Sequence, residues 1–172
     1  MNYKTKLKDI TTFVFDVDGV LNDGIVHLHP SGEMVRTMST RDGYALQLAV
    51  KKGYNVCIIT GGNSEMVKDR MEYLGVQDVY LRASDKLPIL TKYLEDKGVS
   101  FDQVLYMGDD IPDYPCIEKV AVGTCPKDAA VEIRDIANYI SHVDGGRGCV
   151  RDVIEQTLRM QGDWFDKDSF AW

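Results

Sequence analysis

The pattern of apolar and polar residues along the chain predicts short buried strands that alternate with amphipathic helices. Apolar runs rich in β-branched and aromatic residues predict strands at 11–15, 55–60, 78–81, 103–107, 120–123 and 139–141. Apolar residues at helical spacing predict helices at 41–52, 63–74, 84–97, 127–137 and 149–160. Such alternation builds βαβ units and a parallel sheet that is covered on both faces. We therefore expect an α/β fold with a Rossmann-like parallel sheet.

Residues at the ends of these segments refine the prediction. Asn63 or Ser64 is expected to cap the second helix, and Ser84 the third, which Gly98 ends. Between the first strand and the first helix, Pro30-Ser-Gly32 separates two extended segments, which predicts a β-hairpin at 25–38.

Composition and charge narrow the class of protein. The 172 residues suffice for one domain with its own core, so we expect a single domain at 1–172. The net charge of −7 argues against nucleic acid or an anionic membrane as a general partner. No apolar run has the length of a membrane span, and none follows the basic N-terminus as in a signal peptide. The scattered Cys57, Cys116, Cys125 and Cys149 favour reduced thiols in a cytoplasmic protein.

Polar residues gather where the predicted strands end. They are Asp16 and Asp18 after the first strand, Thr60, Gly61 and Gly62 after the second, Lys86 near the third, and Asp109, Asp110 and Asp113 after the fourth. In open parallel sheets, ligands bind at the carboxyl ends of the strands. We therefore expect these residues to form one site.

The residue types at this predicted site suit phosphoryl transfer. Clustered acids repel one another, and a hard divalent cation with oxygen ligands, such as Mg²⁺, removes the repulsion. The Thr60 hydroxyl and the following amides can donate to phosphate oxygens, and Lys86 supplies a positive charge. One carboxylate can then act as nucleophile and a second as general acid/base. Each feature alone also has a structural explanation: surface charge, a strand-to-helix turn, a solvated lysine or a helix cap.

Taken in order, Asp16-Val-Asp-Gly-Val, Ile59-Thr-Gly, Lys86 and Gly108-Asp-Asp-Ile-Pro-Asp113 resemble the four motifs of the haloacid dehalogenase-like phosphatases. The resemblance implies that Asp16 is the nucleophile, that Asp18 is the general acid/base, and that Thr60 and Lys86 bind the transferring phosphoryl group. It further implies that Asp16, the Asp18 backbone carbonyl and Asp109 hold Mg²⁺, with Asp113 in or just outside the ligand sphere.

The segments between the motifs are too short for the cap domain that many members of this superfamily carry. Further stretches, among them Thr40-Arg-Asp-Gly-Tyr44 and Gly145-Gly-Arg-Gly148, are similar to the capless 3-deoxy-manno-octulosonate 8-phosphate phosphatases. That resemblance implies a homotetramer with hairpins at its centre, a site completed by a neighbouring subunit, and release of phosphate on the route to lipopolysaccharide. The substrate contacts it implies are Arg41, Asp42, Gly43, Tyr44, Gln47, Gly61, Gly62, Asn63, Arg70, Lys86 and Arg147.

Several alternatives stay open at this point. Arg70 has no charged neighbour at helical spacing, so a substrate contact and a solvated charge are equally supported. The eight-carbon phosphatases often carry an arginine directly after the Thr-Gly pair, where this chain has Gly62 and Asn63, so Asn63 serves either as a substrate contact or as the helix cap. A nine-carbon sialic-acid-type substrate is an alternative, as is a non-catalytic oligomeric module. The aromatic residues of the tail at 162–172 favour docking on a partner.

Overall fold

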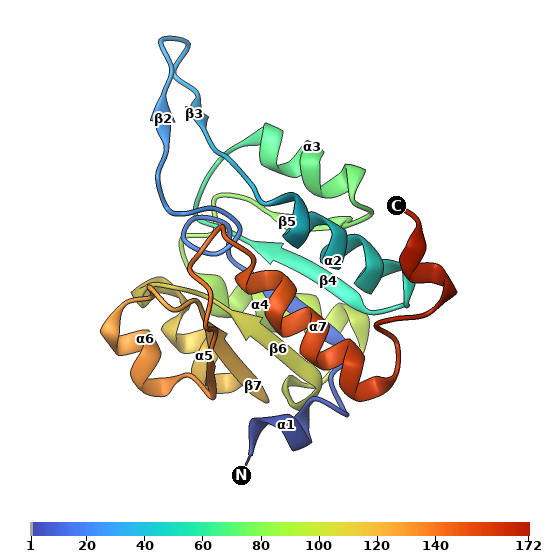
Figure 1. The fold of residues 1–172 in the computed structure, drawn as a ribbon. Coiled ribbons are helices and arrows are strands. Elements are labelled where there is room, and N and C mark those ends of the chain that lie inside the picture. The colour runs from blue at the N-terminus through green and yellow to red at the C-terminus, as the bar shows by residue number, and fades with distance from the viewer. Residues whose placement is uncertain (1) are drawn as a thin grey trace.

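The computed structural model describes residues 2–172 and contains a six-stranded parallel sheet with the strand order β5-β4-β1-β6-β7-β8 (Figure 1). The strands are β1 (Thr12–Phe15), β4 (Asn55–Ile59), β5 (Asp78–Tyr80), β6 (Val104–Met107), β7 (Val122–Cys125) and β8 (Tyr139–Ile140). The helices are α1 (Tyr3–Lys6), α2 (Thr40–Lys51), α3 (Glu65–Tyr73), α4 (Lys86–Lys97), α5 (Tyr114–Lys119), α6 (Val131–Ile136) and α7 (Cys149–Gln161). The predicted α/β fold is confirmed. Among the described helices, none is both long and apolar enough to cross a bilayer.

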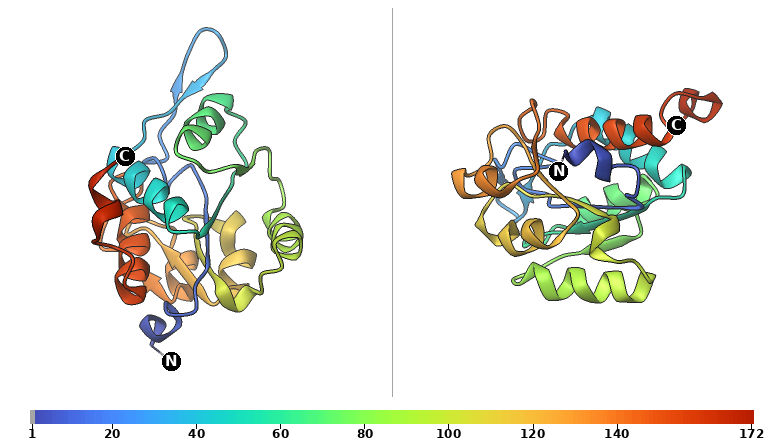
Figure 2. Two further views of the ribbon diagram at one scale, coloured as in Figure 1. Left: turned by 90° about the vertical axis from the view of Figure 1, so that its right-hand side faces the viewer. Right: turned by 90° about the horizontal axis from the view of Figure 1, so that it is seen from below.

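Helices cover both faces of this sheet because side chains alternate along the central strand β1. Phe13 and Phe15 enter an apolar cluster with residues of α2, α3 and α7. Val14 points to the opposite face, into a cluster with residues of α4, α5 and α6. Figure 2 shows α4 and α7 on opposite sides of the sheet. Two apolar layers therefore hold β1 in place, so the residues that follow its carboxyl end are also held in position.

Some predicted boundaries and caps were wrong. The N-cap of α4 is Asp85 rather than Ser84. Of the two candidates at α3, Ser64 is the cap, because its side chain accepts the N–H of Val67. The strand predicted at 120–123 lies at Val122–Cys125, and the helix predicted at 127–137 is only Val131–Ile136. That helix begins later because the Ala130 N–H, which would close a first turn on the Pro126 carbonyl, donates to the Asp109 carbonyl instead. The helix α1 was not predicted.

The predicted hairpin is present but is paired over a shorter length than expected. Its strands, β2 (His27–Leu28) and β3 (Met34–Val35), are antiparallel, and the hairpin projects away from the sheet (Figure 1). Leu28 is 79% exposed and Met34 is 53% exposed. The tip of the hairpin therefore gains little stability from its own chain.

The C-terminal tail packs against its own chain, whereas the sequence favoured docking on a partner. A 3₁₀ turn at Lys167–Phe170 lies against α2, and the Tyr44 hydroxyl donates to the Ser169 carbonyl at 2.6 Å. Trp164 is buried, and Trp172 lies edge-on to the Tyr44 ring. Trp164 thus extends the apolar cluster on this side of the sheet, whereas Phe165, Phe170 and Trp172 are more than half exposed.

Candidate active site

The carboxyl ends of β1, β4 and β6, which are neighbours in the sheet, surround a cleft of about 500 Å³. Its lining includes residues that follow all three strands and the start of α4, namely Asp16, Asp18, Thr60, Gly61, Gly62, Lys86, Asp109 and Asp113. The structure therefore brings together every side chain that the sequence predicted for catalysis or metal binding. We call this pocket the cleft.

Lys86 links two carboxylates at the bottom of the cleft. Its Nζ lies 2.9 Å from Asp16 Oδ2 and 2.7 Å from Asp113 Oδ1. Asp113 also accepts the Tyr106 hydroxyl at 2.7 Å and the Asp109 N–H at 3.2 Å. Lys86 is only 5% exposed, which rules out the alternative of a solvated surface lysine. Tyr106, which holds Asp113 from below, was not predicted to belong to the site.

Negative charge exceeds positive charge among these buried groups. Burial raises the pKa of Asp16, and Asp113 raises it further, while Lys86 opposes the shift. Burial and the nearby Asp16 raise the pKa of Asp109 to about 7. A single ammonium group therefore does not neutralise the three carboxylates.

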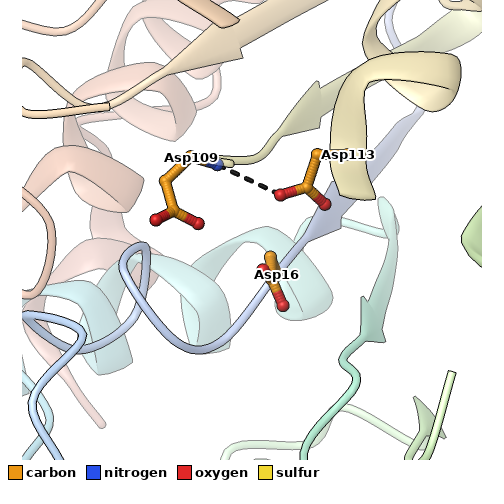
Figure 3. A group of neighbouring side chains, drawn as sticks. All are labelled: Asp16, Asp109 and Asp113. Atoms are coloured by element: carbon orange, nitrogen blue, oxygen red, sulfur yellow. Dashed lines mark hydrogen bonds between the residues drawn. The ribbon is translucent and has the colours of Figure 1, made fainter. Parts of the chain in front are cut away.

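This charge imbalance fits a divalent cation. Asp16, Asp109 and Asp113 each offer a carboxylate oxygen within 4.8 Å of the others (Figure 3). In the described part of the chain, the Asp109 carboxylate accepts no hydrogen bond, so its oxygens are available to a metal. Asp113 differs because both of its oxygens already accept hydrogen bonds. Clustered oxygen donors of this kind suit Mg²⁺.

Asp18 lies at the upper edge of the cleft and is held by two neighbours. Arg36 Nε lies 2.6 Å from Asp18 Oδ1, and Arg36 Nη2 lies 2.9 Å from Asp18 Oδ2. Asn22 Nδ2 also donates to Oδ1, at 2.7 Å. Partial burial raises the pKa of Asp18, but the hydrogen bonds from Arg36 and Asn22 outweigh it and hold the pKa below its usual value. Neither partner was predicted, and only Asn22, one turn after Asp18, lies close enough in sequence to be suspected.

The loop after β4 lies opposite Asp18. Thr60 is buried, and its hydroxyl accepts the Gly62 N–H at 3.1 Å. A Cβ atom at Gly62 would lie 3.2 Å from Arg36 Nη2 and 3.4 Å from Thr60 Oγ1. A larger residue at position 62 would therefore crowd the Arg36 guanidinium.

A groove continues from the cleft along the base of the hairpin. A hollow of about 650 Å³ is lined by Asp18, Arg36 and Asn63 among others. A further hollow of about 380 Å³ shares Arg36 with it and reaches Arg70 on α3. The two hollows share lining residues, and the first shares Asp18 with the cleft, so they form one path, which we call the groove.

Six of the predicted substrate contacts line neither the cleft nor the groove: Arg41, Asp42, Gly43, Tyr44, Gln47 and Arg147. Asp42 is buried at the start of α7, where it accepts the Arg151 N–H at 2.8 Å, and burial raises its pKa to about 6. Tyr44 holds the tail, and Gly43 lies against the Arg70 side chain. In this chain α2 therefore packs against Arg70, which lines the groove. The assignment of these six residues as substrate contacts stays a prediction.

The Gly145–Gly148 segment packs on the loop that follows β1. A Cβ atom at Gly145 would lie 2.0 Å from the Gly19 carbonyl oxygen, so no side chain fits there. Arg147 is exposed, and its Nη2 lies 3.7 Å from Asp23 Oδ2 in the same loop. The glycines thus allow close packing against the loop that carries Asp18. From the sequence alone, this segment could have been only a flexible turn.

Comparison with known proteins identifies the family. A 3-deoxy-D-manno-octulosonate 8-phosphate phosphatase, KdsC, from Salmonella typhi is 37% identical over 158 residues, which cover 92% of this chain and 84% of that protein. The chain belongs to the KdsC phosphatase family. No protein-family model matches it. The family resemblance seen in the motifs is thereby confirmed.

Solved structures of KdsC-family proteins have the same fold. The phosphatase from Yersinia pestis superposes with a TM-score of 0.92 at 31% identity, covering 94% of this chain and 88% of that one. The phosphatase from Moraxella catarrhalis, solved with magnesium, phosphate and KDO, gives a TM-score of 0.90 at 32% identity, covering 93% and 92%. KdsC proteins belong to the haloacid dehalogenase superfamily, so this chain is a hydrolase of phosphate monoesters.

Proposed function

We propose that this chain hydrolyses 3-deoxy-D-manno-octulosonate 8-phosphate to the free sugar acid and inorganic phosphate. The observation that carries the proposal is the cleft itself, in which Asp16, Lys86 and Asp109 converge beside Asp18 in a chain of the KdsC family. The product would feed the formation of the acidic sugar of lipopolysaccharide.

In the proposed mechanism, Asp16 attacks phosphorus while the bond from phosphorus to the sugar oxygen breaks. Asp18 would be protonated in the substrate complex, against the pKa-lowering contacts of Arg36 and Asn22, and gives its proton to that oxygen, which leaves as a hydroxyl. Asp18 then takes a proton from water, which attacks the aspartyl-phosphate, breaks its phosphorus–oxygen bond and regenerates Asp16. Lys86, the Thr60 hydroxyl and the Gly61 N–H would hold the phosphoryl oxygens, while the Gly62 N–H, which donates to Thr60 Oγ1, would orient that hydroxyl.

Mg²⁺ is the proposed cofactor. Asp16, Asp109 and the Asp18 backbone carbonyl would hold it. Asp113 would act mainly by fixing Lys86 and the loop that carries Asp109, because its oxygens are already engaged. When bound, the cation neutralises the carboxylates and the phosphate, which lets the two anions approach each other.

We propose that Arg70 binds the carboxylate of the sugar. Of the three arginines among the predicted substrate contacts, Arg70 lines the groove, whereas Arg41 and Arg147 line neither the groove nor the cleft. Within residues 2–172, Arg70 forms no ion pair, so its guanidinium is available to a substrate. Asn63 lies on the path between the cleft and Arg70, where it would donate a neutral hydrogen bond.

A nine-carbon sugar acid 9-phosphate is the second candidate substrate. The observation that favours it is the absence of an arginine directly after Thr60-Gly61, where Gly62 and Asn63 stand. Without that cation, the groove binds the sugar less strongly near the cleft and can accept a longer chain.

We also propose that the chain forms a homotetramer through its hairpins and acts in the cytoplasm. Ile25, Leu28 and Met34 expose apolar surface on a hairpin that is paired over only two residues per strand. The four cysteines are free and buried, which suits a reducing compartment. Light scattering should give the mass of four chains; a fully active monomer would contradict the assembly.

The proposed reaction is tested by phosphate release from 3-deoxy-D-manno-octulosonate 8-phosphate. With Mg²⁺ present we expect steady turnover, its loss with EDTA and its return when Mg²⁺ is added in excess. Absence of turnover in folded, Mg²⁺-loaded protein on this and other sugar phosphates would contradict the proposal and favour a non-catalytic module.

A further inference from the structure

The hairpin contributes one cation to the groove, Arg36, which binds Asp18 at the edge of the cleft. Arg36 follows β3 directly, yet its side chain is only 7% exposed. Its Nε and Nη2 atoms contact the two oxygens of one carboxylate, and Nη1 donates to the Met34 carbonyl at 2.7 Å. The guanidinium is therefore fixed at one end by the hairpin backbone and at the other by Asp18.

We propose that Arg36 is a positioning residue for Asp18, through which the hairpin sets the direction of proton transfer to and from the reacting oxygen. This inference rests on the proposed role of Asp18 as general acid/base. Nothing in the mechanism above requires Arg36 to touch the substrate.

The geometry supports positioning because the contact is bidentate. A planar guanidinium that binds both carboxylate oxygens fixes the rotation of that carboxylate as well as its place. Asn22 adds a third hydrogen bond, from the loop that follows β1. Proton transfer requires the acid within hydrogen-bond reach of the leaving oxygen, so small errors in the orientation of Asp18 would slow it.

The surroundings of Arg36 are shaped for this contact. The hypothetical Cβ at Gly62 would come within 3.2 Å of Nη2 and 3.5 Å of Asp18 Oδ2, so the absence of a side chain there leaves space for the pair. The hairpin itself has few other connections to the cleft, because its strands pair only with each other. The Arg36–Asp18 contact thus connects the hairpin directly to the proposed general acid/base.

The competing explanation is that Arg36 simply anchors the hairpin, as a salt bridge with no part in turnover. The two explanations differ in how the loss depends on the leaving group. An alkyl phosphate needs a proton on its leaving oxygen, whereas 4-nitrophenyl phosphate releases a stable anion and does not. A misplaced acid therefore slows the first substrate far more than the second, while a disturbed hairpin slows both equally. Loss of Arg36 also lets the pKa of Asp18 rise, which by itself favours the protonated acid, so a selective loss on the alkyl phosphate reports orientation.

The experiment measures kcat/KM for a simple alkyl phosphate and for 4-nitrophenyl phosphate, both without a carboxylate, with saturating Mg²⁺. The ratio kcat/KM reports the steps through release of the alcohol, so it isolates the first proton transfer. The variants are Arg36→Met, Arg36→Lys and Asp18→Asn, with His29→Ala as a matched hairpin control because His29 is exposed and contacts only the hairpin turn.

We expect Arg36→Met to lose about 10²-fold on the alkyl phosphate, the lower end of the contribution of a general acid, and less than a tenth of that on the aryl phosphate. Arg36→Lys should recover part of the loss, because one ammonium keeps the charge but not the two-point contact. His29→Ala should match the wild type on both substrates.

Equal losses of Arg36→Met on the two substrates, or a loss confined to KM, would overturn the inference. Arg36→Lys carries the same test if Arg36→Met does not fold, which thermal unfolding would show. Asp18→Asn separates the role of Arg36 from the role of Asp18. If it shows the leaving-group dependence and the Arg36 variants do not, only the role of Arg36 fails. If Asp18→Asn also loses equally on both substrates, the acid role of Asp18 fails, and the inference with it.

Discussion

The cleft and the far end of the groove are built from different kinds of structural elements. At the cleft, the side chains come from the ends of adjacent central strands, and Lys86 and Asp113 are buried. At the far end of the groove, the lining comes from the hairpin and α3, where Met34 and Met66 are more than half exposed. The sheet thus fixes the proposed chemistry, and surface segments provide the proposed recognition. Substitutions in the cleft should therefore lower kcat, whereas substitutions around Arg70 at the far end of the groove should change KM.

The largest expected effect is at Asp16. Asp16→Asn keeps the shape of the side chain but removes the nucleophile and one charge of the metal site, so turnover should fall by about 10⁴-fold or more. Phosphate release in metal-replete protein measures the loss, and thermal unfolding confirms the fold. Substantial remaining turnover would exclude a covalent aspartyl-phosphate.

Next is Lys86, which should affect both stability and turnover. Lys86→Met leaves Asp16 and Asp113 buried without their shared cation, which should lower the free energy of unfolding by about 3–5 kcal/mol in the absence of metal. Denaturant unfolding measures this change. Lys92→Met, at an exposed ion pair within α4, is the matched control and should change stability by less than about 0.5 kcal/mol. Equal effects of the two variants would show that the lysine in the cleft is not a structural link.

A smaller effect is expected at the far end of the groove. Arg70→Met should raise KM for the sugar acid phosphate by about 10- to 100-fold, the size of a lost charge-assisted hydrogen bond, with little change in kcat. The same variant should leave KM for a simple alkyl phosphate unchanged. Arg41→Met is the control, since Arg41 does not line the groove. A larger effect at Arg41 than at Arg70 would assign carboxylate binding to Arg41 at the start of α2.

The smallest predicted effect is a gain at Asn63. This residue is not the helix cap, because Ser64 is, and it lines the groove next to the cleft. Asn63→Arg should lower KM for the eight-carbon acid by a factor on the order of ten, equivalent to ~1.4 kcal/mol. An unchanged KM would show that position 63 does not face the carboxylate.

The difference between the two ends also explains what the sequence predicted. Asp16, Thr60 and Asp109 each follow an apolar run, and parallel topology alone places such residues at one edge of a sheet. Their convergence could therefore be predicted without coordinates. The alternation of apolar strands and amphipathic helices likewise predicted that helices cover both faces of the sheet.

The remaining contacts depend on distant segments that no local pattern connects. Arg36, at the base of the hairpin, meets Asp18 across 18 positions, and the tail meets Tyr44 from 125 positions away. Asp42 has the sequence context of a substrate contact, yet its carboxylate lies at the start of α7. Such pairings are set by tertiary packing, which propensity and spacing do not encode.

The most direct test of the proposed function compares two substrates in one assay. Values of kcat/KM are measured with Mg²⁺ for 3-deoxy-D-manno-octulosonate 8-phosphate and for a nine-carbon 3-deoxy-2-keto sugar acid 9-phosphate. We predict that the eight-carbon substrate is preferred, and that Arg70→Met removes most of the preference. A wild-type preference for the nine-carbon acid would contradict the substrate assignment while leaving the chemistry of the cleft intact.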